Sequence, residues 1–222
     1  MLIFQSIILA IVQGITEFLP VSSTAHLVLI PWLLGWPDPG LTFSVAVHGG
    51  TLIAVLTYFW RDWVDLLKAG FRLGDPSSKE IRENRNLLFY LAVATLPGGL
   101  AGFFFESFVQ KDFRHHLVIS GALIIIALVM WQADRLYSPK KNLGGVSFWN
   151  ALIIGLAQST AIIPGVSRSG ATISAGLFLN MSREASARFS FLLSAPIIGG
   201  AALKTGMNVW NEGLPQEILC SF

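Results

Sequence analysis

The sequence predicts an all-α, polytopic membrane protein with two re-entrant helical hairpins arranged as an inverted-topology repeat. Of its 222 residues, 53% are hydrophobic and only 13% are charged, and the mean hydropathy is +0.63. A soluble domain of this length needs a more polar surface. Residues 1–222 are therefore expected to form a single transmembrane domain. The clearest spans are four apolar stretches, each near the roughly 20 residues that cross a hydrocarbon core: Phe43 to Trp60, Leu87 to Phe105, Leu117 to Trp131 and Phe189 to Met207.

Basic residues between the predicted spans indicate which loops face the cytoplasm. The loop between the first two spans is the richest in positive charge, with Arg61, Lys68, Arg72, Lys79, Arg82 and Arg85. The next loop has only Lys111 and Arg114. Because positively charged loops stay on the cytoplasmic side, the first loop is predicted to be cytoplasmic. Its polar stretch, Asp75 to Asn86, is interpreted as a solvated loop and not as a binding element.

Two further apolar regions are each broken by a proline and a turn rich in Ser, Thr and Gly. In the first, helices are predicted over Leu2 to Leu19 and Ala25 to Leu34, with Pro20 at the break. In the second, helices are predicted over Trp149 to Ile163 and Ala171 to Leu179. Unwound backbone at membrane depth survives only where protein or a watery cavity satisfies it. Two such breaks therefore suggest re-entrant hairpins that line a common cavity.

The two broken regions also resemble each other. The run that ends at Gln13 matches the run that ends at Gln158, and the segment from Pro20 matches the segment from Pro164. We interpret this as a diverged internal repeat, over about residues 1–106 and 117–222, with the second copy incomplete. An odd number of predicted crossings separates the copies, so they run through the membrane in opposite senses. Such a pair brings its two breaks together near the midplane, where they share one pocket.

The first break has the residue types of a site that binds an anion. Gln13 and Glu17 are four residues apart and lie on one helical face, where they could hold a metal or a nucleophile. A carboxylate inside the membrane is costly enough that a function is the preferred interpretation. Ser22, Ser23 and Thr24 precede a helix, so their hydroxyls and the free N–H groups of its first turn converge on one point. Helix N-termini favour anions.

The second break adds a permanent positive charge. Ser167, Arg168 and Ser169 form the equivalent cap there. The planar guanidinium of Arg168 is suited to bind phosphate oxygens at two points. Together the two motifs predict one phosphate-handling active site within the bilayer.

A histidine completes a possible catalytic set. His26 follows Ser23 by three positions, so its imidazole can meet the hydroxyl on the same helical face. In that arrangement Ser23 attacks phosphorus, Glu17 orients the imidazole or binds a divalent ion, and Arg168 stabilises the developing charge. His26 as the nucleophile, and direct attack by water, are left open. His48 is interpreted as a packed polar group.

Two motifs, QGITEFLPVSSTAH from Gln13 to His26 and PGVSRSGAT from Pro164, resemble the signatures of bacterial undecaprenyl-pyrophosphate phosphatase, the bacitracin-resistance family. The similarity extends to the FWR run at Phe59 and the FSFLL run at Phe189. The resemblance implies a multi-pass enzyme of the bacterial plasma (inner) membrane. It removes the terminal phosphate of a long-chain isoprenyl diphosphate lipid and so recycles the carrier for cell-wall synthesis.

The resemblance also assigns residues and a cofactor. Carried over by position, the expected active-site residues are Gln13, Glu17, Ser23, Thr24, His26, Arg168, Ser169 and Thr172. A divalent cation, Mg or Ca, is expected, with Glu17 as a ligand. Members of the family continue with further spanning helices, so the fold of this chain is expected to be truncated at the C-terminus.

The main alternative is an inverted-repeat transporter or flippase for an anionic lipid or a small anion, because broken helices at mid-depth are typical of transporters. A carrier has no evident need for a Ser, His and Glu cluster at attack spacing opposite an arginine, and a purely structural scaffold leaves both polar motifs unexplained. No nucleic-acid partner is expected. A homo-oligomer is left open, since apolar helix faces meet lipid and partner subunits alike.

Overall fold

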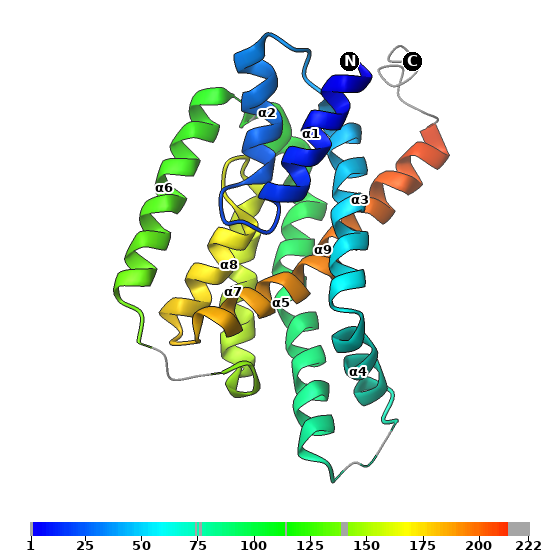
Figure 1. Ribbon diagram of the computed structural model, residues 1–222, viewed down its shortest axis with the longest axis vertical. Helices are drawn as coiled ribbons and strands as arrows, with labels where there is room; N and C mark the ends of the chain where they lie inside the picture. Colours follow the sequence, from blue (N-terminus) through cyan, green and yellow to red (C-terminus); the bar gives the residue numbers. More distant parts are fainter. Residues whose placement is uncertain (1, 74, 76, 114, 139–141, 213–222) are drawn as a thin grey trace.

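The computed structural model describes residues 2–212, apart from residues 74, 76, 114 and 139–141. The described part of the chain is helical throughout its regular elements, which confirms the all-α prediction (Figure 1). The elements in order are α1 Ile3–Thr16, α2 Ser23–Leu34, α3 Gly40–Tyr58, α4 Trp60–Gly70, α5 Lys79–Asp112, α6 His116–Arg135, η1 Leu143–Gly145, α7 Phe148–Ser159, η2 Thr160–Ile162, α8 Arg168–Phe178 and α9 Arg183–Glu212.

The long helices are those of a membrane protein. Three of them contain a segment long and apolar enough to cross a bilayer: Lys79–Phe105, His116–Arg135 and Arg183–Lys204. They contain three of the four predicted spans. The remaining one, Phe43 to Trp60, coincides with α3, which qualifies together with α4 as a pair bent by 74°.

The predicted loop from Asp75 to Asn86 is partly wrong, because α5 already begins at Lys79. The sequence from Lys79 is KEIRENR, which is rich in good helix formers. Glu80 lies in the first turn, where a negative charge favours the helix dipole. Lys79 and Glu83 form an ion pair across one turn at 3.7 Å. The charged side chains stay exposed, so the segment is solvated as expected although it is helical.

The two broken regions form pairs of short helices. The four helices α1, α2, α7 and α8 have 14, 12, 12 and 11 residues, fewer than the roughly 20 needed to cross a bilayer. Figure 1 shows α1 and α2 in the upper half of the molecule and α7 and α8 in the lower half. The segment that joins α1 to α2 nevertheless lies against the start of α8, where Ser169 Oγ donates to the carbonyl oxygen of Leu19.

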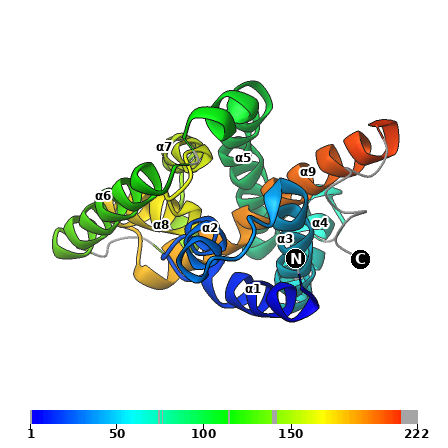
Figure 2. The ribbon, with the colours of Figure 1, turned by 90° about the horizontal axis from the view of Figure 1, so that it is seen from above.

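The helices pack around α9, which crosses the middle of the molecule when it is seen from above (Figure 2). Phe189, Leu192 and Leu193 of α9 are buried in a core shared with α5 and α7. Helices α5 and α7 make a close backbone contact at Gly155. A methyl group on Gly155 would lie 2.6 Å from the carbonyl oxygen of Ala94. The absence of a side chain is therefore what lets the two backbones approach.

Ion pairs join helix ends at the lower end of the molecule in Figure 1. Arg183, at the start of α9, binds Asp134 of α6 with an N–O distance of 2.7 Å. Arg188 of α9 forms an ion pair with Asp62 of α4.

The close contact at Gly155 can be tested by adding one methyl group. Gly155→Ala forces α5 and α7 apart, because the clash is with backbone atoms that cannot rotate away. We expect a loss of about 1–3 kcal/mol, as is usual for overpacking, measured as a lower thermal unfolding midpoint in detergent. The control is Gly121→Ala in α6, where no atom lies within 4 Å of the added methyl group. An unchanged midpoint for Gly155→Ala would contradict the packing.

Candidate active site

Glu17 is the centre of the site. It follows the last turn of α1 and is only 7% exposed. Its Oε2 accepts hydrogen bonds from Gln13 Nε2 at 2.7 Å and from Ser23 Oγ at 2.5 Å. The prediction that Gln13 and Glu17 lie on one helical face is confirmed. The break after Pro20 turns the chain back, so that Ser23 at the start of α2 reaches the same carboxylate.

Arg168 brings the second motif to this carboxylate. Its Nη2 donates to Glu17 Oε1 at 2.5 Å, across 151 positions of sequence. Ser169 Oγ donates to the carbonyl of Leu19 at 3.2 Å and joins the two connecting segments again. The shared location of the two motifs, predicted from the repeat, is therefore observed.

A glycine makes this approach possible. Gly165 has a φ of +97°, and a methyl group there would lie 2.4 Å from the carbonyl oxygen of Ile119 in α6. Only a residue without a side chain fits this left-handed turn against α6. The turn leads directly into α8, whose first residue is Arg168.

His48 is the histidine that contacts the carboxylate. Its Nε2 lies 3.2 Å from Glu17 Oε2, and its Nδ1 lies 2.6 Å from the carbonyl oxygen of Ser44. Nδ1 faces a carbonyl oxygen and Nε2 faces a carboxylate oxygen, so both ring nitrogens donate in the doubly protonated ring. The sequence interpretation of His48 as a packed polar group did not include this contact with Glu17 or its place on the cavity lining. The available signal was a histidine inside a predicted span, which is costly without a partner.

His26 has a different position from the predicted one. Its Nδ1 lies 2.8 Å from the carbonyl oxygen of Ser22, and it is not among the described residues that line the cavity. The hydroxyl of Ser23, its expected partner, binds Glu17. Ser22 has a φ of +62°, a conformation that costs a non-glycine residue of order 1–3 kcal/mol. The imidazole of His26 thus binds the carbonyl oxygen of Ser22, a residue of the first break with a strained backbone.

Both predicted helix caps are present, and both helices begin at the site. Ser22 Oγ accepts from the N–H of Ala25 at 3.4 Å, and Ser167 Oγ accepts from the N–H of Gly170 at 3.0 Å. Ser167 Oγ also lies 3.1 Å from Ser169 Oγ. The first N–H groups of a helix have no partner within the helix, so the N-termini of α2 and α8 together favour an anion here.

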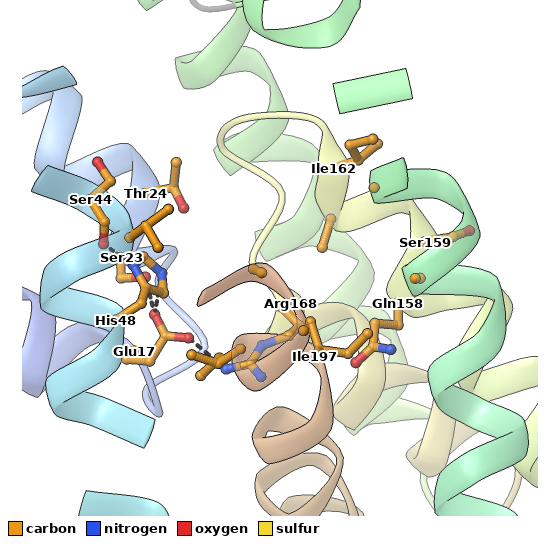
Figure 3. Close-up of a pocket in the computed structure, with 18 of the residues that line it drawn as sticks. Glu17, Ser23, Thr24, Ser44, His48, Gln158, Ser159, Ile162, Arg168 and Ile197 are labelled. Carbon is orange, nitrogen blue, oxygen red and sulfur yellow. Dashed lines mark hydrogen bonds and ion pairs between the residues drawn. The ribbon is translucent and has the colours of Figure 1, made fainter. Parts of the chain in front are cut away.

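These groups occupy one wall of a cavity of about 850 Å³ (Figure 3). That volume is in the range of sites for small molecules and lipid-sized ligands. Figure 3 shows Arg168 between the cluster of Glu17, Ser23 and His48 and the side chain of Gln158. The other walls, from α5, η2 and α9, are mostly apolar or glycine. The polar residues on the lining are Glu17, Ser22, Ser23, Thr24, Ser44, His48, Thr95, Gln158, Ser159, Ser167, Arg168, Ser169 and Lys204.

Thr172 and Gln158 are two further polar residues near the cluster. Thr172 Oγ1 lies 2.9 Å from the carbonyl of Arg168 and 2.7 Å from Ser190 Oγ, outside the described lining. Gln158 lines the cavity and donates from Nε2 to the carbonyl of Ala94 at 3.2 Å. Its buried Oε1 has no hydrogen-bond partner within the described residues. Sequence comparison of the two repeats had marked Gln158 only as the counterpart of Gln13.

The arrangement is a buried carboxylate surrounded by donors. A carboxylate so placed can accept the proton of the Ser23 hydroxyl or of a water molecule. Arg168 Nη1 is buried and has no hydrogen-bond partner in the described part of the chain, so one arm of the guanidinium is available to an incoming anion. Among the described residues, no group of three or more His, Cys, Asp or Glu side chains could hold a metal ion.

The buried ion pair can be tested through stability. Arg168→Met removes the guanidinium that pairs with the buried Glu17 carboxylate, and breaking a buried pair typically costs about 3–5 kcal/mol. We expect the double variant Glu17→Gln with Arg168→Met to lose less than Arg168→Met alone, because neither charge remains. The losses are measured as the unfolding midpoints of the single and double variants in detergent. Additive losses in the double variant would show that the two side chains do not interact.

Comparisons with known proteins identify the family of this chain. Residues 6–220 match the family described as bacitracin resistance protein BacA. The chain is 51% identical over 203 residues to an undecaprenyl-diphosphatase of Moorella thermoacetica, which covers 91% of this chain and 76% of that protein. It is 51% identical over 201 residues to that of Desulforudis audaxviator, covering 90% and 74%. With that of Thermomicrobium roseum the identity is 44% over 223 residues, covering 97% and 80%. The chain belongs to the bacitracin resistance protein BacA family.

Proposed function

We propose that this chain is a membrane phosphatase that hydrolyses undecaprenyl diphosphate to undecaprenyl phosphate and inorganic phosphate. The observation that carries the proposal is the meeting of Ser23, Glu17 and Arg168 on one cavity wall. It agrees with the name undecaprenyl-diphosphatase that the similar proteins share. The reaction returns the lipid carrier to cell-wall synthesis, and by restoring the carrier it gives resistance to bacitracin.

The chemistry begins at the hydrogen bond between Ser23 and Glu17. Ser23 Oγ attacks the terminal phosphorus while its proton passes to Glu17 Oε2. A bond from Oγ to phosphorus forms, and the bond from that phosphorus to the bridging oxygen breaks. Undecaprenyl phosphate leaves with the bridging oxygen. Water then attacks the phosphorus of the phosphoserine and the bond from phosphorus to Ser23 Oγ breaks. Glu17, beside His48, returns its proton to Ser23 Oγ, and both protons of the water leave with the inorganic phosphate.

Two alternatives for the attacking group have different support. Direct attack by water uses the same carboxylate as base and needs no covalent intermediate. Attack by His26 has less support, because its Nδ1 faces the Ser22 carbonyl and its ring is not part of the described lining. We therefore favour a serine or water nucleophile, in each case activated at Glu17.

Charge on the transferred phosphoryl group is stabilised by fixed donors. The Nη1 group of Arg168 and the N-termini of α2 and α8 already point to this wall before any ligand arrives. Donors held in place in this way need little reorganisation when charge develops in the transition state. Ser167 and Ser169 add hydroxyls within the same wall.

The rest of the cavity suits the isoprenyl chain. Beyond the polar wall the lining is apolar, with residues such as Phe103, Ile197, Ile198, Leu203 and Met207 from α5 and α9. When the isoprenyl chain packs against these apolar residues, the diphosphate lies at the polar wall. The position of the headgroup would then decide which phosphorus faces Ser23.

We place the enzyme in the bacterial plasma (inner) membrane as a multi-pass protein with two re-entrant hairpins in an inverted repeat. The short lengths of α1, α2, α7 and α8 support the hairpins. The opposite placement of the two helix pairs, with their breaks adjoining, supports the inversion (Figure 1). An inverted pair of this kind accounts for a site built from motifs far apart in sequence.

A divalent cation, Mg or Ca, is part of the proposal. Glu17 is the one carboxylate on the described lining, and donors already surround it. The donor set therefore fits a cation only when phosphate oxygens of the substrate supply further ligands, as is common for Mg. Such an ion, held by Glu17 and the diphosphate, would neutralise charge on the phosphoryl oxygens.

Phosphate release from undecaprenyl diphosphate in detergent tests the proposed function. Ser23→Ala removes the proposed nucleophile and is expected to lower kcat by at least about 100-fold. The matched control is Ser159→Ala, since Ser159 also lines the cavity but its hydroxyl binds the carbonyl of Leu156 in its own helix. The control should stay within about twofold of the unmodified chain. Full turnover by Ser23→Ala and by Glu17→Gln would contradict this active site, and no phosphate release by the unmodified chain would favour the transporter alternative.

His48→Phe tests the newly identified histidine. The change keeps the volume of the ring but removes the Nε2 contact with Glu17. We expect kcat to fall by about 100-fold or more with a smaller change in KM, because proton transfer is impaired more than binding. Kinetics in detergent measure the two constants separately. Unchanged kcat would assign His48 a packing role after all.

A further inference from the structure

Helix α4 lies across the direction of α3. The two helices are joined at Phe59 and are bent by 74°. If α3 runs through the bilayer, a helix at this angle lies close to the membrane plane. In Figure 1, α4 is found near the lower end of the molecule, beyond the end of α3.

The outer face of α4 is an apolar stripe. Trp60, Val64, Leu67 and Phe71 are spaced by four, three and four positions, so they share one side of the helix. Their exposed fractions are 55%, 37%, 46% and 75%. The stripe therefore faces away from the protein and has no partner within the described residues that covers it.

A different face attaches α4 to the protein. Leu66 and Ala69 are each 1% exposed and belong to the side that packs against α5. Asp62 forms the ion pair with Arg188 of α9. Because these contacts use the other side of the helix, they hold the apolar stripe outward in a fixed direction.

Basic residues border the stripe. The exposed Arg61 and Lys68 lie on the same flank of the helix, and Arg72 follows its C-terminus. The guanidinium of Arg61 lies 5.5 Å from the centre of the Trp60 ring. Asp65 is the one acidic neighbour on this flank, 4.0 Å from Lys68, so the flank keeps a net positive charge. An apolar stripe beside a basic flank is typical of helices that bind an anionic membrane surface.

We propose that α4, with the stripe of Trp60, Val64, Leu67 and Phe71, is an interfacial helix lying in one leaflet. The stripe inserts among the first carbons of the acyl chains. Arg61, Lys68 and Arg72, on the flank nearer to water, bind the phosphate groups of anionic phospholipids. The inference does not depend on the hydrolase activity, only on the chain being embedded in a bilayer.

Anchoring of α4 in the membrane interface also affects the position of His48. Helix α3 carries Ser44 and His48, and α4 is the continuation of α3. A helix anchored in the interface fixes the depth of the lower end of α3. It therefore helps to hold His48 at the level of Glu17.

Spin labels on adjacent residues test the stripe. In a Cys220→Ser background, single cysteines at Val64→Cys and Leu67→Cys report the stripe, and Asp65→Cys and Lys68→Cys are the matched controls one residue away. Each labelled protein is reconstituted in vesicles of phosphatidylglycerol and phosphatidylcholine. Collision with oxygen, which concentrates in lipid, is compared with collision with a water-soluble nickel chelate. We expect oxygen to dominate at 64 and 67 and nickel at 65 and 68.

Two results would overturn the stripe assignment. Equal access of the nickel chelate to positions 64 and 65 would mean that α4 projects into water. Dipolar broadening between labels at position 64 on different copies would mean that the stripe contacts a second copy of the chain.

The headgroup contact is tested by charge removal. In the variant Arg61→Gln, Lys68→Gln and Arg72→Gln, we expect the phosphatidylglycerol retained through purification, measured by mass spectrometry, to fall severalfold. The control removes an equal charge from the start of α5, with Lys79→Gln, Arg82→Gln and Arg85→Gln. Equal retention by the α4 variant and the unmodified chain, or an equal fall in the control, would refute a specific contact at α4.

Discussion

The ion pair between Glu17 and Arg168 is the interaction on which the organisation of this protein depends. Each of these charges would be costly alone at the depth where the two connecting segments meet. Together they satisfy each other and join two motifs separated by 151 positions. Ser23, Gln13 and His48 are arranged around the carboxylate, and the turn at Gly165 delivers the guanidinium. Removing either charge would disturb both the shape of the cavity and its chemistry.

The division of the cavity into a polar wall and apolar walls follows from the same constraint. Broken helices supply N–H groups and hydroxyls only where the backbone unwinds, which is at the two connections. The continuous helices α5 and α9 supply apolar side chains and glycines. An amphiphilic ligand with an anionic head and an isoprenoid tail matches this division, and the family to which the chain belongs contains enzymes named for such a ligand.

Much of this could be predicted from the sequence, since hydropathy and proline placement are local signals. Pattern and repeat predicted the spans, the two breaks, the caps at Ser22 and Ser167, and the proximity of Glu17 to Arg168.

What the pattern did not predict depended on contacts between different helices, on backbone conformation or on helix propensity. His48 enters the site because α3 packs beside α1, and nothing in the spacing of one helix reports that contact. His26 was assigned from spacing within α2, but the left-handed Ser22 directs its ring to a carbonyl. The early start of α5 was missed because charged residues were taken as loop, although they are good helix formers.

The separation of Glu17 and Arg168 along the chain also orders the assembly of the protein. A ribosome must add 151 residues after the carboxylate before its counter-ion exists. The N-terminal helix pair and the contact of Glu17 with His48 can therefore be made before the guanidinium exists. The cluster around Glu17 is complete only after the second helix pair has been synthesised.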